Sequence, residues 1–179
     1  MKIKIISGSP RQRSLTVRVA KHLLKRLKEE KVDVELIDLR EHQIPFVETV
    51  WSTLDKVPSE FKELGEKIFS ADAFILVSPE YNGGYSPALK NLLDHFPKQS
   101  RKVFGIATAT DGALGAMRSA QQLIQMVAAF FGILSPQLLI TPHVDKKFDE
   151  EGNLTDDSFQ KAIDTFVSEF LWLAKKIKD

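Results

Sequence analysis

Short apolar runs alternate along the chain with segments in which apolar residues recur every three or four positions. Most of the runs are apolar almost throughout, as expected for strands that are covered on both faces. They span residues 3–7, 34–39, 73–78, 103–108 and 133–140. This alternation of strand and helix predicts an α/β fold, with a parallel sheet and right-handed crossovers.

The segments between the runs predict amphipathic helices, because their apolar side chains fall on one stripe at helical spacing. The stripes lie at residues 20–27, 61–68, 123–131 and 159–177. A shorter helix is predicted to begin at Pro87, since Ser86 suits an N-cap and proline suits the first helical position. No internal repeat or flexible linker interrupts the 179 residues, so the sequence predicts a single domain over residues 1–179.

The segment from residue 44 to 58 fits neither pattern. It has no clean period, yet it carries large apolar residues that include Phe46 and Trp51. A loop this long and apolar is commonly functional or covered by another element. Two interpretations stay open. The segment folds onto its own domain, or it forms a lid or subunit contact in which Trp51 reaches the neighbouring subunit.

Composition narrows the possible functions. The chain has 25 Lys and Arg against 24 Asp and Glu, and this near-neutral balance argues against a general role at nucleic acids or membrane surfaces. It has no cysteine, which excludes disulfides, iron–sulfur clusters and thiol catalysis. No histidines have metal-ligand spacing, so no metal site is predicted. The N-terminus lacks the features of a signal peptide, and we expect a cytoplasmic protein.

Three motifs follow predicted strands, and the first opens the first helix at residues 7–16. Free backbone N–H groups and the helix dipole favour an anion there, and Ser9, Ser14 and Thr16 add hydroxyl donors. Arg11 can donate two hydrogen bonds to phosphate oxygens. The motif is neither a P-loop nor the dinucleotide fingerprint. The alternative interpretation is a capped helix start with a solvated arginine.

The second motif spans residues 79–91, and the third spans residues 109–116. In the second, adjacent glycines allow close backbone approach, and Tyr81 and Tyr85 offer flat faces to an aromatic ligand. In the third, small residues leave room for a ligand edge. Each could also be an ordinary turn. With strand order 2-1-3-4-5, however, all three loops meet at one edge of the sheet, which predicts one phosphate-bearing aromatic ligand.

These motifs resemble those of the NADPH-dependent FMN reductase family. The resemblance rests on Gly8-Ser9-Pro10-Arg11 with Ser14, on Pro79-Glu80-Tyr81-Asn82-Gly83 leading to Leu89-Lys90-Asn91, and on Asp111-Gly112-Ala113-Leu114-Gly115 before Arg118. It implies a three-layer flavodoxin-like sandwich with a five-stranded parallel sheet of order 2-1-3-4-5. It also implies FMN as cofactor, with NADPH or NADH as co-substrate.

The resemblance further implies thirteen FMN-binding residues in three groups. The phosphate would be held by Ser9, Arg11, Ser14, Leu15 and Thr16, the isoalloxazine lined by Pro79, Glu80, Tyr81, Asn82 and Gly83, and its other side approached by Thr110, Asp111 and Gly112. No dedicated catalytic side chain is expected, because hydride transfer is the chemistry of the flavin itself.

The function so implied is a reductase that passes a hydride from the nicotinamide coenzyme through FMN to a small acceptor. Free flavin, a quinone, an azo compound and a metal oxyanion are candidate acceptors. The alternatives are a flavodoxin-like electron carrier without its own nicotinamide oxidation, and a flavin-free interaction partner.

Two further features of the sequence concern partners. The predicted helix at residues 119–131 is apolar around more than one face, so we expect a homodimer or a tetramer. Residues 11–31 hold eight basic and two acidic residues. This composition is typical of a solvated helix face, and it would also attract phosphate-bearing ligands.

Overall fold

The computed structural model describes residues 1–178 and has the predicted α/β architecture, with a sheet of order β2-β1-β3-β4-β5 between two layers of helices. In chain order the helices and strands are β1 (Lys2–Ser7), α1 (Thr16–Glu29), β2 (Asp33–Asp38), α2 (Lys62–Ser70), β3 (Ala73–Ser78), α3 (Pro87–Asp94), β4 (Val103–Ala109), α4 (Met117–Ala129), β5 (Ile133–Leu134), β6 (Leu139–Thr141), α5 (Val144–Lys147) and α6 (Gln160–Lys178). All neighbouring strands pair in parallel.

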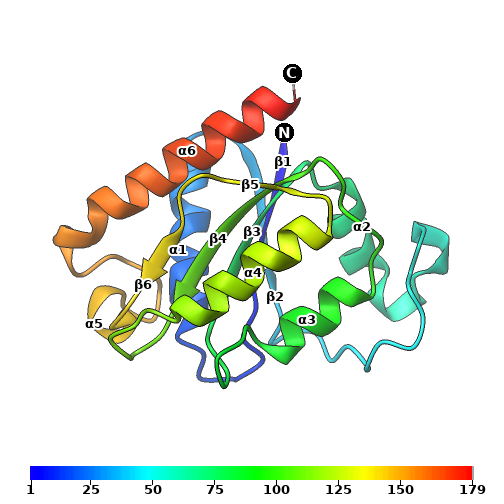
Figure 1. The fold of residues 1–179 in the computed structure, drawn as a ribbon, viewed down its shortest axis with the longest axis horizontal. Coiled ribbons are helices and arrows are strands. Elements are labelled where there is room, and N and C mark those ends of the chain that lie inside the picture. Colours follow the sequence, from blue (N-terminus) through cyan, green and yellow to red (C-terminus); the bar gives the residue numbers. More distant parts are fainter. Residues whose placement is uncertain (179) are drawn as a thin grey trace.

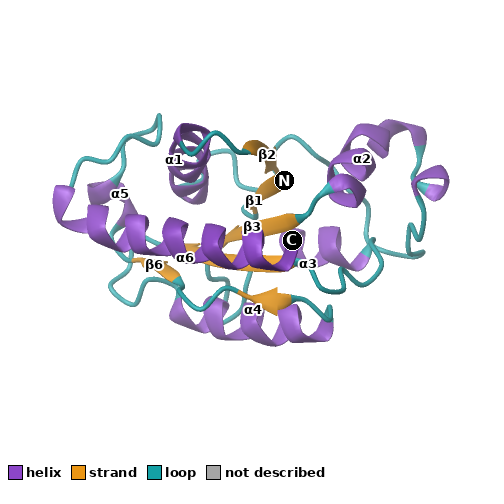
Figure 2. Cartoon of the chain, turned by 90° about the horizontal axis from the view of Figure 1, so that it is seen from above, coloured by secondary structure: helices purple, strands orange, loops and turns teal. Residues whose placement is uncertain are grey.

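The core consists of two apolar clusters, one on each face of the sheet. Ile3 and Ile5 of β1 pack with α1 and α6, whereas Ile6 packs with α2, α3 and α4. Every residue of β3 and β4 is buried, which explains why these strands read as continuous apolar runs. In Figure 1, α4 crosses in front of the strands and α1 lies behind them, and Figure 2 shows the same two helices on opposite sides of the sheet.

The fifth predicted strand, over residues 133–140, is broken into β5 and β6, so the sheet has six strands rather than five. The backbone N–H of Ser135 still donates to the carbonyl of Phe104 at 2.8 Å. Pro136 follows, and because proline has no N–H the ladder stops there. Pairing with β4 resumes at Leu139, opposite Ala107. The break leaves the order of the sheet unchanged.

The irregular segment at residues 44–58 folds largely onto its own domain. Trp51 is only 6% exposed, its ring centre lies 4.3 Å from that of His95, and its backbone N–H donates to the His95 carbonyl at 2.7 Å. The expectation that Trp51 reaches a neighbouring subunit is therefore wrong, because the indole is buried within this chain. Phe46, by contrast, is 88% exposed.

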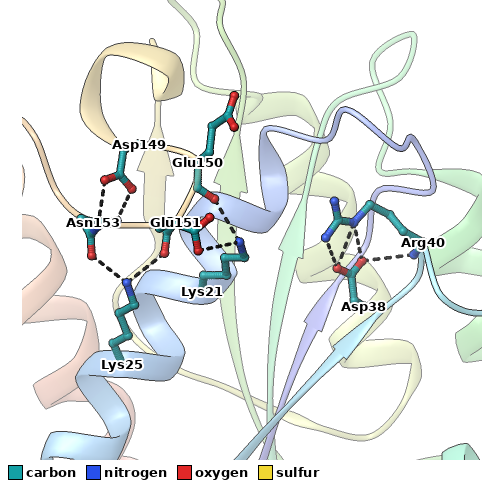
Figure 3. Close-up of polar contacts among 8 residues, drawn as sticks. All are labelled: Lys21, Lys25, Asp38, Arg40, Asp149, Glu150, Glu151 and Asn153. Carbon is teal, nitrogen blue, oxygen red and sulfur yellow. Dashed lines mark hydrogen bonds and ion pairs between the residues drawn. The ribbon is translucent and has the colours of Figure 1, made fainter.

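The basic face of α1 binds the loop at residues 148–153 (Figure 3). Lys21 donates to the Glu150 carbonyl at 3.0 Å, and Lys25 donates to the Glu151 carbonyl at 2.9 Å and to Asn153 Oδ1 at 2.7 Å. Much of this face is thus occupied by the chain itself, rather than being a solvated helix face.

His22, on the same helix, makes native stability depend on pH. Its Nδ1–H donates to the Gly152 carbonyl at 3.0 Å, while Nε2 is buried and has no partner among residues 1–178. Burial, reinforced by the charges of Arg26 and Lys25, lowers the pKa of His22 below its ordinary value of 6.5. Below that pH the unfolded chain binds a proton that the folded chain does not, so the free energy of unfolding falls as the medium is acidified.

We expect His22→Asn to flatten this pH dependence, because an asparagine amide keeps a donor for Gly152 but does not titrate. Urea unfolding of both proteins, from about pH 7.5 down to about pH 5.5, measures the difference across the window that begins at the ordinary histidine pKa. If the free energy of unfolding falls equally steeply with pH in the two proteins, a group other than His22 causes the pH dependence.

Candidate functional site

The three predicted motifs converge in space. The loops after β1, β3 and β4 all leave the sheet at the lower edge of Figure 1, where the carboxyl ends of the parallel strands lie. Between them is a cavity of about 290 Å³, lined by ten of the thirteen predicted residues together with Arg13 and Ala109. The three that do not line it are Asn82, Gly83 and Gly112. A larger hollow, of about 720 Å³, lies at the opposite end of the sheet around Lys4 and Glu35 and includes none of these motifs.

The loop after β1 is built to receive an anion. Helix α1 begins at Thr16, and Leu15 before it offers no side-chain cap, so the first amides of the helix lack a side-chain acceptor. Ser9, Ser14 and Thr16 are buried, and the Oγ of Ser14 has no hydrogen-bond partner among residues 1–178. A buried hydroxyl without a partner is unfavourable, and a phosphate oxygen would satisfy it.

The loop after β3 carries Tyr81 into the cavity on a tight turn. The backbones of Tyr81 and Gly84 exchange hydrogen bonds of 2.8 and 3.0 Å. Between them Asn82 and Gly83 have φ of 52° and 83°, as a type I′ turn requires. This geometry accounts for the Asn-Gly pair. The Arg11 guanidinium lies 4.5 Å from the centre of the Tyr81 ring, so the first two loops meet at the cavity.

Buried serines fix these loops relative to one another. The hydroxyl of Ser86 donates to the Gly8 carbonyl and accepts from the N–H of Leu89 at 3.1 Å, which caps α3 as predicted. Ser119 of α4 donates to Ser78 Oγ at 3.2 Å. The loop after β1, the loop after β3 and the start of α4 are thereby joined through side chains that are inaccessible to water.

The third loop is held by residues that the sequence did not single out. Its Thr110 N–H donates to the Thr141 carbonyl at 3.2 Å, and the Asp111 carbonyl lies 3.0 Å from Nδ1 of His143. The sequence predicted no metal site at the histidines and did not indicate this contact. His143 has a φ of 48°, and its ring contacts the loop at the carbonyl of Asp111, a residue that lines the cavity.

Glu80 has a structural role that the sequence did not predict. Helix α4 starts after Ala116, a residue with φ of 60° that offers no cap. The carboxylate of Glu80 accepts from the N–H of Arg118 at 3.2 Å and from its guanidinium at 3.2 Å. Glu80 therefore caps α4 from another loop, and it orients the turn that carries Tyr81.

We expect Glu80→Ala to lower the free energy of unfolding by about 1–2 kcal/mol, the range for loss of a helix cap. Glu80→Gln keeps an acceptor for the Arg118 N–H and loses only the ion pair, so its loss is expected to stay below about 1 kcal/mol. Urea unfolding of the flavin-free chain measures the loss of stability in each of the two variants. Equal losses would show that capping is not what Glu80 contributes.

Comparison with known proteins identifies the family. The model of the NADPH-dependent FMN reductase family matches residues 1–145. The chain belongs to this family. It is also 32% identical, over 177 residues, to an FMN-dependent NADPH-azoreductase of Staphylococcus aureus, and the match covers 96% of this chain and 94% of that protein. The predicted enzyme class and coenzymes are thus confirmed: the chain is an NAD(P)H-dependent FMN reductase.

Solved structures confirm the flavodoxin-like fold. The flavoenzyme NAD(P)H:(acceptor) oxidoreductase of Paracoccus denitrificans superposes with a TM-score of 0.78 at 22% identity, over 98% of this chain and 97% of that one. A flavodoxin of Pseudomonas aeruginosa superposes with a TM-score of 0.60 at 18% identity, over 95% and 99%.

Within residues 1–178, no three metal-ligating side chains lie together in a group that could hold a metal ion. None of the helices in that part of the chain is long and apolar enough to cross a membrane.

Proposed function

We propose that the cavity between the three loops binds FMN, with its phosphate at the start of α1 and its isoalloxazine between the second and third loops. The observation that carries this assignment is the buried, unpartnered Oγ of Ser14 beside the uncapped first turn of α1. The phosphate group would be held by Ser9, Arg11, Ser14 and the amides of Leu15 and Thr16.

The flavin ring would lie against Tyr81, whose hydroxyl is also buried and has no partner among the described residues. Pro79 and Glu80 form the wall behind it, and Thr110 and Asp111 form the wall opposite. Asn82, Gly83 and Gly112 would act through the shape of their turns. When bound, FMN supplies the redox chemistry, by taking a hydride from NADPH and passing two electrons to an acceptor. The residues of the chain bind and orient the flavin.

An azo compound is the acceptor we propose, because the Staphylococcus aureus relative is an FMN-dependent NADPH-azoreductase. The decisive experiment is anaerobic. The FMN-loaded protein should lose its yellow colour on addition of NADPH without any added reductase, and an azo dye should restore the colour as the dye bleaches. A protein that does not retain FMN on loading would overturn the proposed site, and bound FMN that NADPH does not bleach would overturn the proposed hydride transfer. Failure of the dye alone to restore the colour would exclude azo compounds and direct the search to quinones and free flavin.

We also propose a homodimer that pairs through the exposed side of α4. Apolar side chains remain exposed at this helix and its flanks: Leu114, Met117, Ala128 and Phe131. Association would remove this surface from water. Sedimentation equilibrium at micromolar concentration tests the proposal, since a single species near the chain mass of 20.2 kDa would exclude it.

A further inference from the structure

A second cavity adjoins the phosphate end of the proposed FMN site. It has a volume of about 530 Å³ and shares Arg13, Ser14 and Leu15 with the flavin cavity, so the two adjoin along the start of α1. Ser14, whose buried Oγ has no partner among residues 1–178, lines both. We call this second cavity the basic groove.

The charge of the groove favours a phosphate. Four cationic side chains line it, Arg13, Arg18, Lys21 and Arg40, against the carboxylates of Glu150 and Glu151. Figure 3 shows two of the cations, Lys21 beside Glu150 and Glu151, and Arg40 beside Asp38. Arg13 is exposed and makes no hydrogen bond or ion pair within residues 1–178.

Arg18 and Lys21 each donate to a main-chain carbonyl, of Phe148 at 2.9 Å and of Glu150 at 3.0 Å, and each has further N–H groups that could donate to a ligand. The side chain of Arg40 donates three hydrogen bonds to the carboxylate of the buried Asp38, which fix its position. The two carboxylates are weak competitors. Glu150 lies 3.8 Å from Arg18, Glu151 lies 3.5 Å from Lys21, and both carboxylate side chains are at least 76% exposed. Exposed pairs at such distances contribute little, so a phosphate could displace them.

From this geometry we infer that the basic groove binds the adenosine-phosphate half of a dinucleotide. The inference rests on the proposed function, because the flavin phosphate at Ser14 sets the point from which the ligand continues. Two dinucleotides share this chemistry. In FAD the adenylate is joined directly to the flavin phosphate, and in NADPH the adenosine carries a 2′-phosphate that NADH lacks. Arg18, Lys21 and Arg40 line the groove but not the flavin cavity, and they supply the charges that an adenosine phosphate requires.

The flavin arm of the test is a competition experiment. FAD is added to the FMN-loaded protein, and the released FMN is quantified after ultrafiltration. Lys21→Gln removes a charge that lines the groove, whereas Lys25→Gln, the matched control, removes the neighbouring lysine that binds the same loop outside the groove. We expect Lys21→Gln to reduce the preference for FAD over FMN about fivefold and the control to leave it unchanged. Glu151→Gln should increase the preference for FAD over FMN.

The coenzyme arm uses the same variants, loaded with FMN, in steady-state turnover. If the groove holds the NADPH 2′-phosphate, Lys21→Gln raises the KM for NADPH about fivefold but leaves that for NADH unchanged, and the effect fades at high salt. A response in either arm identifies the source of the adenosine phosphate. Equal behaviour of Lys21→Gln and Lys25→Gln in both arms would overturn the inference, while the proposed function would stand as long as FMN binds and NADPH reduces it.

Discussion

Replacing Arg11 with alanine is expected to weaken FMN binding by about 1.5–3 kcal/mol, the contribution of hydrogen bonds to a charged group. Arg11 is the one arginine of the phosphate loop that also stacks on the ring of Tyr81, at 4.5 Å from its centre. Its guanidinium can donate two parallel hydrogen bonds to phosphate oxygens beside Ser9 and Ser14. Titration of FMN into the flavin-free protein, followed by quenching of flavin fluorescence, gives the dissociation constant.

Two controls separate the phosphate contact from general damage. Riboflavin lacks the phosphate, so its affinity should change much less than that of FMN in Arg11→Ala. Arg11→Lys keeps the charge but not the planar fork, and it should give an intermediate loss of FMN affinity. An unchanged FMN dissociation constant in Arg11→Ala would remove this residue from the site.

The sheet was predictable because its strands are buried on both faces. A strand such as β3, with all six residues buried, reads as an uninterrupted apolar run, and alternation with helices then fixes a parallel sheet. The break between β5 and β6 also had a signal in the sequence. Pro136 lies inside the predicted fifth strand, and proline within a strand argues against unbroken pairing.

The convergence of the three loops on one cavity was predictable from topology, since loops at the carboxyl ends of neighbouring parallel strands lie at the same edge of the sheet. The roles of individual side chains were less predictable from the sequence. Glu80 stands in the predicted flavin loop, yet its carboxylate caps α4, because the fold brings Arg118 beside it across 38 positions of sequence. Trp51 was open to two interpretations for the same reason: two of the rings that enclose it, those of His95 and Phe96, belong to a distant segment.

The loop at residues 148–153 shows how a local motif depends on a remote surface. Its sequence indicates only an acidic turn. In the structure the turn is held against α1 by main-chain carbonyls that accept from Lys21, His22 and Lys25. The basic face of α1, which the sequence described as solvated, is what selects this loop conformation.

Gly152→Ala is the substitution expected to disturb that contact most. Gly152 has a φ of +75°, which an alanine adopts only with strain. A Cβ at this position would lie 2.7 Å from the Arg18 carbonyl oxygen and 3.0 Å from the His22 backbone nitrogen, and neither backbone atom can move without displacing α1. Strain and collision together should lower the free energy of unfolding by about 2–4 kcal/mol, as measured by urea unfolding of the flavin-free chain.

Gly112→Ala is the matched control. A Cβ at Gly112 would meet only the Thr110 hydroxyl at 3.5 Å, an ordinary contact, so its effect on stability should stay within about 0.5 kcal/mol. Hydrogen exchange then locates the damage. If α1 holds the loop, Gly152→Ala should lower the protection of amides at residues 148–153 and in the first turns of α1. The amides of β3 and β4 should keep their protection better. Uniform loss of protection across the sheet would show instead that the loop and the core unfold as one unit.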